Sequence, residues 1–353
     1  MPAQQVVGYV FPQNGPIQPG QVDAHAMTRI NYAFAGLTGG RVTLASANAA
    51  NDLAQLVSLR RENGELKILI SVGGWLGSGG FSDAALTDAT REAFAASAAE
   101  LVEQDDLDGL DIDWEYPGMA GAGNPYRAED KHNFTLLLGA VRHSFDALTR
   151  RTHRHYLLTL AAGASDEFLA HTEMAQVARW ADSINLMTYD AYEAGSDEIT
   201  GHHAPLYANP ADPKRESADR YVRAFLAAGV PPGKLILGVP FYGRMWGQVP
   251  DVQHGLFQPG KAIPDSFAPF SRIQESFLAQ GFVRYWDGAA RVPYLYNAEK
   301  QIFISYEDQE SLAGKCAYVK AKHLGGVMFW SYFNDDQGKL LDTIDRALLP
   351  HHK

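Results

Sequence analysis

Short apolar runs that alternate with longer amphipathic stretches constrain the fold of this chain more than any other feature of its 353 residues. The runs are rich in β-branched and aromatic residues, which is typical of buried parallel strands. They occupy residues 6–11, 29–35, 67–72, 109–114, 156–161, 183–189, 234–240 and 326–332. Eight strands that alternate with helices over this length predict an α/β fold, a closed (β/α)8 barrel of the TIM type.

The stretches between the runs have the apolar spacing of helices at residues 87–104, 129–148, 217–228, 307–323 and 336–348. Thr87 stands at the N-cap position of the first of these helices. The competitor of the barrel is an open, doubly wound parallel sheet. No G-x-G-x-x-G pattern follows the first apolar run, which disfavours the dinucleotide-binding form of that sheet.

The last two runs are separated by roughly 85 residues, more than one crossover helix with its loops requires. Within this interval, residues 244–306 are rich in proline and aromatic side chains, with a short helical pattern at 272–279. Residues 293–296 and 301–306 flank a polar turn and predict a hairpin. We therefore expect one barrel domain over residues 1–353, with a small α+β subdomain inserted at residues 244–306.

The charge balance narrows the possible partners. The chain has 30 Lys and Arg against 41 Asp and Glu, a net charge of -11 at pH 7, so we expect neither nucleic acid nor a membrane as partner. Cys316 is the single cysteine, which excludes an internal disulfide framework and a cysteine-based zinc site. The pairs His153/His155 and His202/His203 have no acidic or cysteine partner at ligand spacing, so we expect no bound metal.

Acidic residues occupy every second position at the end of the fourth run: Asp111, Asp113 and Glu115. Because strand side chains alternate between two faces, these three share one face and the apolar residues between them share the other. The apolar face suits packing against helices, which turns the acids into the barrel. Their mutual repulsion is expected to raise at least one pKa toward neutrality. Glu115, nearest to the end where barrel enzymes place their chemistry, is the candidate general acid.

Two other interpretations of this acidic face stay open. One is a solvated edge strand, which the regular alternation of Ile112 and Trp114 with the acids disfavours. The other is a site for Mg²⁺ or Ca²⁺, because stacked carboxylates are the hard oxygen ligands that these ions prefer.

The sequence resembles glycoside hydrolase family 18, the chitinase family. Residues 108–115 match the family signature D-x-x-D-x-D-x-E at every fixed position. Residues 71–74, Ser-Val-Gly-Gly, look like its S-x-G-G motif, and residues 187–190, Met-Thr-Tyr-Asp, match its M-x-Y-D motif. Trp330 lies on the last predicted strand, where family members place a tryptophan. A small α+β insertion before that strand is typical of one bacterial-type subgroup of the family.

The resemblance implies a retaining, substrate-assisted mechanism, in which the 2-acetamido carbonyl of the sugar attacks the anomeric carbon and forms an oxazolinium ion. Glu115 is then the general acid and later the base. Asp113 orients the acetamido N–H, and Asp111 shares a proton with Asp113. Tyr189 donates to the acetamido oxygen, which is stabilisation of the oxyanion-hole type. Asp108 is expected to be structural, and no cofactor is implied.

The resemblance also implies a set of sugar-binding side chains. Trp330 is expected to form the floor under the sugar at the cleavage point, and Trp75 to extend stacking toward the leaving-group side. Gly73 and Gly74 are expected to let the backbone pass close to the sugar. The other members of the set are Tyr9, Phe34, Met187, Asp190, Tyr242 and Arg244. The sequence leaves open whether Tyr192, Trp246 and Trp286 belong to a site or to a core.

The implied activity is that of a chitinase, with chitin or N-acetylglucosamine oligosaccharides as its partners. Two alternatives on the same fold stay open: an endo-β-N-acetylglucosaminidase acting on N-glycans, and a non-catalytic chitin-binding lectin. Lectins of the family lack the catalytic glutamate, which this chain has as Glu115. The insertion favours the chitinase, because it builds one wall of a deep cleft in relatives that bind long chains. We expect a monomer, secreted by resemblance; the absence of a targeting signal after Met1 leaves an intracellular protein or a trimmed chain as alternatives.

Overall fold

Eight parallel strands close into a barrel in the computed structural model, which describes residues 4–350. The strands are β1 (Gln5–Val10), β2 (Arg29–Thr38), β4 (Lys67–Gly73), β5 (Gly109–Asp113), β6 (Leu157–Gly163), β7 (Ser183–Met187), β8 (Leu235–Pro240) and β14 (Gly326–Trp330). Each strand pairs in parallel with the next, and β14 pairs with β1. The predicted barrel is therefore confirmed. The expected absence of a targeting signal concerns the N-terminus, where Met1–Ala3 lie outside the described residues.

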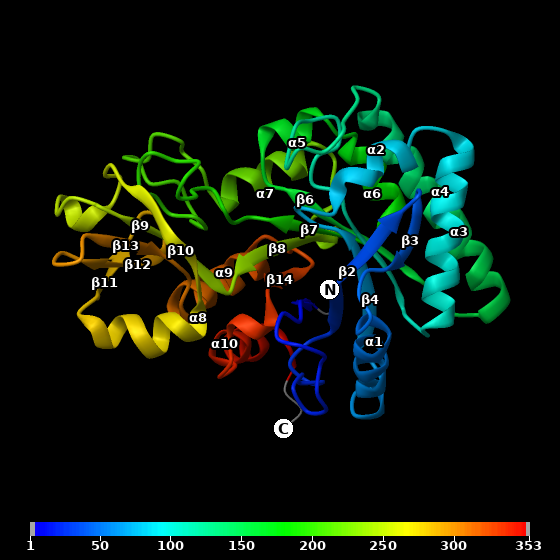
Figure 1. Ribbon diagram of the computed structural model, residues 1–353, viewed down its shortest axis with the longest axis horizontal. Coiled ribbons are helices and arrows are strands. Elements are labelled where there is room, and N and C mark those ends of the chain that lie inside the picture. Colours follow the sequence, from blue (N-terminus) through cyan, green and yellow to red (C-terminus); the bar gives the residue numbers. More distant parts are fainter. Residues whose placement is uncertain (1–3, 351–353) are drawn as a thin grey trace.

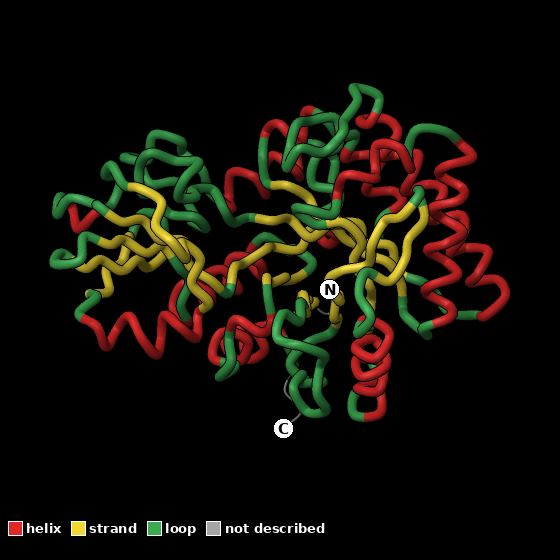
Figure 2. Tube along the Cα trace, in the orientation of Figure 1, coloured by secondary structure: helices red, strands yellow, loops and turns green. Residues whose placement is uncertain are grey.

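Helices surround the barrel strands, as Figure 2 shows. They are α1 (Ala49–Ser58), α2 (Phe81–Ala84), α3 (Asp88–Gln104), α4 (Asp130–Thr152), α5 (Asp166–Ala170), α6 (Met174–Trp180), α7 (Ala218–Ala227), α9 (Gln309–Ala321) and α10 (Lys339–Leu348). The five predicted helices correspond to α3, α4, α7, α9 and α10. Helices α1, α5 and α6 were not predicted, because α5 and α6 are too short for a periodic pattern and α1 buries few large apolar side chains. A short strand, β3 (Arg41–Leu44), pairs antiparallel with β2.

Local sequence accounts for the two longest of these helices. Thr87 caps α3 as predicted, and its hydroxyl accepts from the backbone N–H of Thr90 while the Thr90 hydroxyl accepts from the N–H of Thr87. This capping box satisfies two of the amide donors that a helix start leaves unpaired. The apolar stripe predicted for α4 is fully buried, and it comprises Phe134, Leu137, Leu138, Val141 and Phe145.

A second sheet lies beside the barrel and forms the lobe on the left of Figure 1. It contains β9 (Tyr242–Gly247), β10 (Lys261–Pro269), β11 (Val283–Asp287), β12 (Val292–Asn297) and β13 (Ile302–Ser305), with the short helix α8 (Phe270–Arg272) at the start of a helical segment that continues to Gln280. Strands β12 and β13 pair antiparallel, so the predicted hairpin is confirmed. Both the hairpin and the helical segment thus fall where the spacing of apolar residues placed them.

The second sheet has a core of its own, to which the barrel contributes. Trp246 of β9 is fully buried in it together with Tyr192, which lies in the loop after β7. The hydroxyl of Tyr192 donates to Asp212 at 2.5 Å. These two aromatic residues, which the sequence left open, therefore belong to a core rather than to an exposed surface. Trp286 of β11 is half-buried, and the guanidinium of Arg284 lies over its ring.

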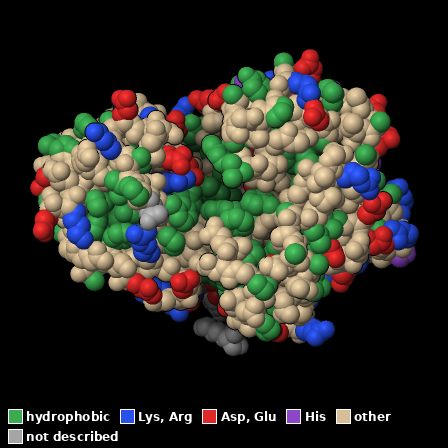
Figure 3. Space-filling view, in the orientation of Figure 1, with side chains coloured by type: hydrophobic (Ala, Val, Ile, Leu, Met, Phe, Trp, Pro, Cys, Tyr) green, Lys and Arg blue, Asp and Glu red, His purple; other side chains and the backbone are tan. Residues whose placement is uncertain are grey.

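The two lobes meet along a hollow on the face shown in Figure 3, and hydrophobic side chains are visible within it. None of the helices within residues 4–350 combines the length and the apolar character needed to cross a bilayer.

Candidate active site

The alternation of side chains on β5 separates a polar face from an apolar face. Asp111 is fully buried and Asp113 is 4% exposed, and both come from the face that points into the barrel. On the opposite face the ring of Trp114 stacks on Phe81 at 5.3 Å and meets Phe134 of α4 edge-on. The predicted division of β5 into an acidic interior face and an apolar helix-facing side is therefore confirmed, and a solvated edge strand is excluded.

Hydrogen-bond donors converge on both oxygens of Asp111. Its Oδ2 accepts from the hydroxyl of Tyr9 at 2.7 Å and from that of Ser71 at 2.8 Å. Its Oδ1 accepts from the hydroxyl of Thr159 at 2.5 Å and from the amide of Asn185 at 3.1 Å. Ser71 and Thr159 are in register with Asp111 on the two neighbouring strands, which is why they reach it. This set of donors suits an ionised carboxylate, which can only accept.

Asp113 lies one step closer to the open end of the barrel and in a different environment. Its Oδ1 is buried and has no hydrogen-bond partner within the described chain. Burial, and then the charges of Glu115 and Asp111, raise the pKa of Asp113 well above its usual value. No hydrogen bond joins Asp113 to Asp111 within residues 4–350, so the two carboxyl groups differ sharply in their partners.

Glu115 follows directly after β5, at the C-terminal end of the barrel. Its backbone N–H donates to the hydroxyl of Ser78 at 3.1 Å, which ties it to the loop after β4. Burial is the larger cause that raises the pKa of the Glu115 carboxyl to about 7, and the charge of Asp190 is the second. The predicted pKa shift among these acids is thus found at two carboxyl groups. Repulsion between the acids of the β5 face contributes at Asp113, whereas the repelling charge at Glu115 comes from Asp190, and burial is the larger cause at both.

Asp190 joins the loop after β7 to the first strand of the inserted sheet. Its carboxylate accepts from the hydroxyl of Tyr242 at 2.7 Å and from Nε of Arg244 at 2.8 Å. The Nδ1 atom of the buried His203 lies 3.6 Å from it. Although burial alone raises the pKa of Asp190, His203 and Arg244 hold it well below its usual range. Asp190 is therefore a fixed negative charge near Glu115.

Aromatic side chains gather inside the barrel mouth. The ring of Trp330 lies 5.6 Å from Tyr9, 5.7 Å from Phe34 and 5.5 Å from Phe11. One hydrophobic cluster contains these rings together with Met187, Tyr189, Val7, Ala33, Ile236 and Met328. The structure thus brings together four of the eight predicted sugar-binding residues in one cluster, Tyr9, Phe34, Met187 and Trp330, although they come from four different strands. Stacked rings of this kind offer the apolar surface that the C–H face of a sugar contacts.

Tyr189 and Trp75 occupy the edge of this arrangement. Tyr189 is half-buried, with its hydroxyl 3.8 Å from the sulfur of Met328 and its ring against Tyr242. Burial raises the pKa of Tyr189, as do the charges of the nearby acids, so its hydroxyl stays a proton donor. Trp75 is 58% exposed and meets Tyr116 edge-on at 5.2 Å, which places an aromatic surface at the rim.

Gly73 and Gly74 allow close packing between protein segments. Both have positive φ, +114° and +85°. A Cβ at Gly73 would lie 2.1 Å from the carbonyl oxygen of Asp113, and one at Gly74 would lie 2.7 Å from the ring of Phe34. These glycines therefore let Asp113 and Phe34 pack closely against the chain, which is a role beyond the expected approach of the protein backbone to the sugar.

Several residues of the site were not predicted from the sequence. Phe11, Thr159, Asn185 and His203 all contact predicted site residues. The period-two pattern would have placed Thr159 and Asn185 inside the barrel, but no sequence signal shows which carboxylate they reach. Asp108 accepts from Arg60 at 2.5 Å and from the backbone N–H of residue 68 at the opposite end of the barrel, as its expected structural role requires.

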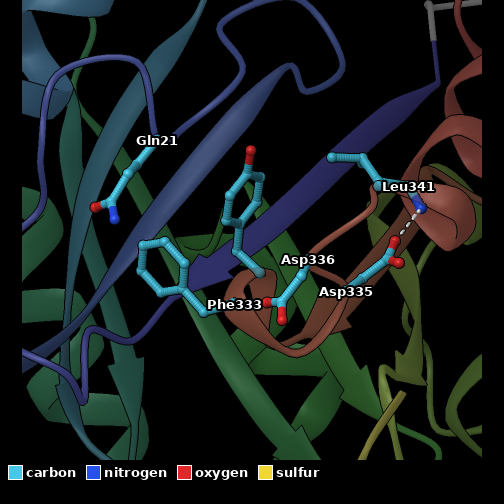
Figure 4. A pocket seen from close by; sticks show the side chains of 7 residues that line it. Gln21, Phe333, Asp335, Asp336 and Leu341 are labelled. Atoms are coloured by element: carbon cyan, nitrogen blue, oxygen red, sulfur yellow. Dashed lines mark hydrogen bonds between the residues drawn. The ribbon is translucent and has the colours of Figure 1, made fainter. Parts of the chain in front are cut away.

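A separate cavity of about 240 Å³ lies beside the start of α10, away from the acids. Figure 4 shows Asp335 accepting from the backbone N–H of Leu341 there, with Phe333 and Asp336 nearby. The carboxylate of Asp335 accepts from the backbone N–H groups of Lys339, Leu340 and Leu341 at the start of α10, so it is already occupied. No group of three possible metal ligands is found among residues 4–350. His202 instead lies 2.9 Å from Asp287 in the inserted sheet.

Comparison with known proteins places these features in one family. Residues 5–335 match the sequence profile described as glycosyl hydrolases family 18. Chitinase A1 of Niallia circulans is 43% identical over 317 residues, a match that covers 85% of this chain. The chain spans 45% of the length of that relative.

Solved structures with the same fold include two informative neighbours. A glycoside hydrolase family 18 N-acetylglucosaminidase from Paenibacillus barengoltzii superposes with a TM-score of 0.90 at 43% identity, covering 98% of this chain and 100% of that one. A class V chitinase from Nicotiana tobaccum, solved in complex with NAG4, superposes with a TM-score of 0.89 at 28% identity. That match covers 98% of this chain and 99% of the other.

Proposed function

We propose, from the premise that the chain belongs to glycosyl hydrolase family 18, that it is a chitinase which cleaves β-1,4 bonds between N-acetylglucosamine units. The observation that carries the proposal is Glu115, a half-buried carboxyl directly after β5 whose pKa is raised to about 7. Such a group is protonated in part at neutral pH and can donate to a glycosidic oxygen. Chitinase A1 and the NAG4-bound chitinase, which this chain resembles, support the choice of sugar.

The mechanism follows from the partners of each acid. Glu115 donates its proton to the leaving oxygen and then removes a proton from water. Asp113 has a free, buried Oδ1 that suits the sugar's acetamido N–H. Tyr189, which remains protonated, can donate its hydroxyl to the acetamido oxygen and so hold that group in place for its attack on the anomeric carbon. Trp330 and its neighbouring rings support the sugar from below.

The arrangement favours assistance by the substrate over a carboxylate nucleophile. Most retaining glycosidases use a second carboxylate ~5–5.5 Å from the acid, and this family is an exception. Asp111 is fully buried and occupied by donors, and Asp190 is held by Tyr242 and Arg244. Neither is free to attack the anomeric carbon, and burial with the neighbouring charges raises the pKa of Asp113, which favours its protonated, less nucleophilic form. We therefore assign the nucleophile to the acetamido carbonyl of the substrate.

An N-acetylglucosaminidase is the second candidate. It is favoured by the Paenibacillus barengoltzii enzyme, which this chain matches at 43% identity over its full length. The two activities share the acid and the acetamido pocket, so the residues above do not separate them. Product analysis on defined N-acetylglucosamine oligomers and on an N-glycan distinguishes internal cleavage from release of single sugars, and chitin from glycan substrates.

Glu115→Gln tests the assignment of the acid. We expect turnover to fall by at least ~10²-fold, the low end of general acid–base contributions, while chitin oligomers still bind. Calorimetry measures the binding and reducing-end release measures the turnover. Glu103→Gln, an exposed change on α3, is the control and keeps normal activity. Near-normal turnover of the Glu115 variant contradicts the proposal.

Substrates that lack the acetyl group at the cleavage point test the assistance of the acetamido group. We expect oligomers with glucosamine there to react very slowly, because the nucleophile is then missing. Partially deacetylated oligomers of known sequence, with products identified by mass spectrometry, provide the measurement. Equal rates on both sugars at that position exclude substrate assistance and leave the fold assignment untouched.

A further inference from the structure

A cation lies buried in the barrel beneath the acids. Arg29 of β2 is 2% exposed, and its side chain points into the barrel. Its guanidinium donates to Ser183 at 2.8 Å, to Asn185 at 2.8 Å and to Gln5 at 3.2 Å, all of them neutral side chains. A buried cation with only neutral partners is costly unless a negative charge lies nearby to offset it.

One amide links this cation to the acids. Asn185 accepts from Arg29 through Oδ1 and donates through Nδ2 to Oδ1 of Asp111, at 3.1 Å. The guanidinium can only donate and a carboxylate can only accept, so the amide is oriented by its two neighbours. The chain from Arg29 through Asn185 to Asp111 is therefore polarised in a single direction, from cation to anion.

We propose that Arg29, acting through Asn185, is a positioning residue that holds Asp111 as a carboxylate and thereby keeps the proton of the acid pair on Asp113. The proposal rests on the proposed hydrolase function and deepens it. Asp111 has donors on both oxygens, whereas Oδ1 of Asp113 has none. A proton on Asp113 spares the desolvated site a second negative charge beside Asp111. The sugar then meets an acid pair whose proton has a fixed place.

The titratable groups around Asp111 and Arg29 come from several elements. Tyr9 of β1, Asp113 of β5 and Tyr189 after β7 surround Asp111, and Asp182 before β7 also acts on Arg29. Within this set Arg29 supplies the positive charge. Burial lowers the pKa of Arg29 and the charge of Asp111 counteracts that effect, as expected if cation and anion stabilise each other through the amide.

Arg29→Met tests the inference through a pH profile. Without the cation, the proton of the acid pair is no longer confined to Asp113, so the acidic limb of the kcat profile moves to higher pH by about half a unit to one unit. We expect kcat at its optimum to fall about tenfold, on the scale of a charge–charge interaction inside a protein. KM stays within about twofold because Arg29 does not touch the sugar. Arg29→Lys keeps the charge. We expect it to restore most of kcat and to return the acidic limb close to its wild-type pH.

Two further variants separate a positioning role from a merely structural one. Arg91→Met removes another buried arginine, whose partners Ala85 and Asp88 lie outside the barrel. It lowers the melting temperature but leaves the pH profile unchanged. Asn185→Leu keeps the cation and removes the link, so it moves the acidic limb in the same direction as Arg29→Met, and it decides the question if Arg29→Met does not fold.

Specific outcomes overturn the inference. One is a wild-type acidic limb in both Arg29→Met and Asn185→Leu. Another is a loss of activity that follows thermal stability alone and that Arg29→Lys does not reverse. Both outcomes leave the wild-type hydrolysis of N-acetylglucosamine oligomers intact, and so differ from failure of the proposed function, in which the wild-type chain itself is inactive on them.

Discussion

The proton affinity of Glu115 depends on two separate features of its surroundings. Burial is the larger contribution, and the fixed charge of Asp190 is the second. Asp190 can act in this way because His203 and Arg244 keep it ionised, and the hydrogen bonds from Tyr242 and Arg244 hold it in place. The M-x-Y-D motif therefore contributes a charge that raises the pKa of Glu115, in addition to the sugar-binding role that the family resemblance implies for Asp190.

Asp190→Asn is predicted to move the basic limb of the activity profile. In the wild-type chain we expect activity to decline as the pH rises through about 7, because the pKa of Glu115 is raised to about 7 and the proposed acid loses its proton there. Removing the neighbouring negative charge lowers the pKa of Glu115, so the variant loses activity at a pH lower by about one unit. The pH dependence of kcat/KM measures this shift.

A matched control for that variant is Glu193→Gln. Glu193 also pairs with Arg244, at 2.9 Å, but is not among the groups that raise the pKa of Glu115. We expect its basic limb to stay at the wild-type position. If the basic limb of the Asp190→Asn profile stays at the wild-type pH, or moves to higher pH, the role assigned to Asp190 is contradicted.

At the level of elements, local signals placed the strands and several helix ends correctly. The alternation on β5 predicted which side chains enter the barrel, and the capping residue of α3 predicted where that helix begins. Such signals succeed because strand faces and helix starts depend on the positions of nearby residues. Elements without them, such as the short α5 and α6, were not predicted.

Thr87→Ala is predicted to cost about 1 kcal/mol of the free energy of unfolding, because the α3 start loses its side-chain cap. The capping box lies in the layer of helices outside the barrel, so we expect kcat on oligomers to stay at the wild-type value. Urea denaturation measures the stability change. Thr87→Ser keeps the hydroxyl and is expected to retain most of the wild-type stability. An unchanged stability in Thr87→Ala means that the cap contributes nothing.

At the level of the whole molecule, the inserted sheet and the barrel share the site. Strand β9 carries Tyr242 and Arg244 to Asp190, and the loop after β7 completes the core of the inserted sheet. A fully buried ion pair, Lys315 of α9 with Glu307, lies where the chain returns to the barrel. Lys315 also donates to the carbonyl of Ala204 at 2.6 Å, which joins that loop to α9.

Lys315→Met is predicted to destabilise the protein by about 3–5 kcal/mol, because it leaves the carboxylate of Glu307 buried without its partner. The double variant Glu307→Leu/Lys315→Met removes both charges, and we expect it to recover much of the loss. Chemical denaturation of the two variants measures the difference. A single variant as stable as the double variant shows that the unpaired charge carries no penalty.

The sequence by itself determined the barrel, the acidic face of β5 and the place of Glu115. These follow from periodicity and short motifs, which encode which face of a strand a side chain occupies. Tertiary structure alone decided the donors on Asp111, the charge of Asp190 beside Glu115 and the buried Arg29. Each of these depends on which segments distant in the chain meet when the barrel closes, and both burial and the distances between charges are set only at that point.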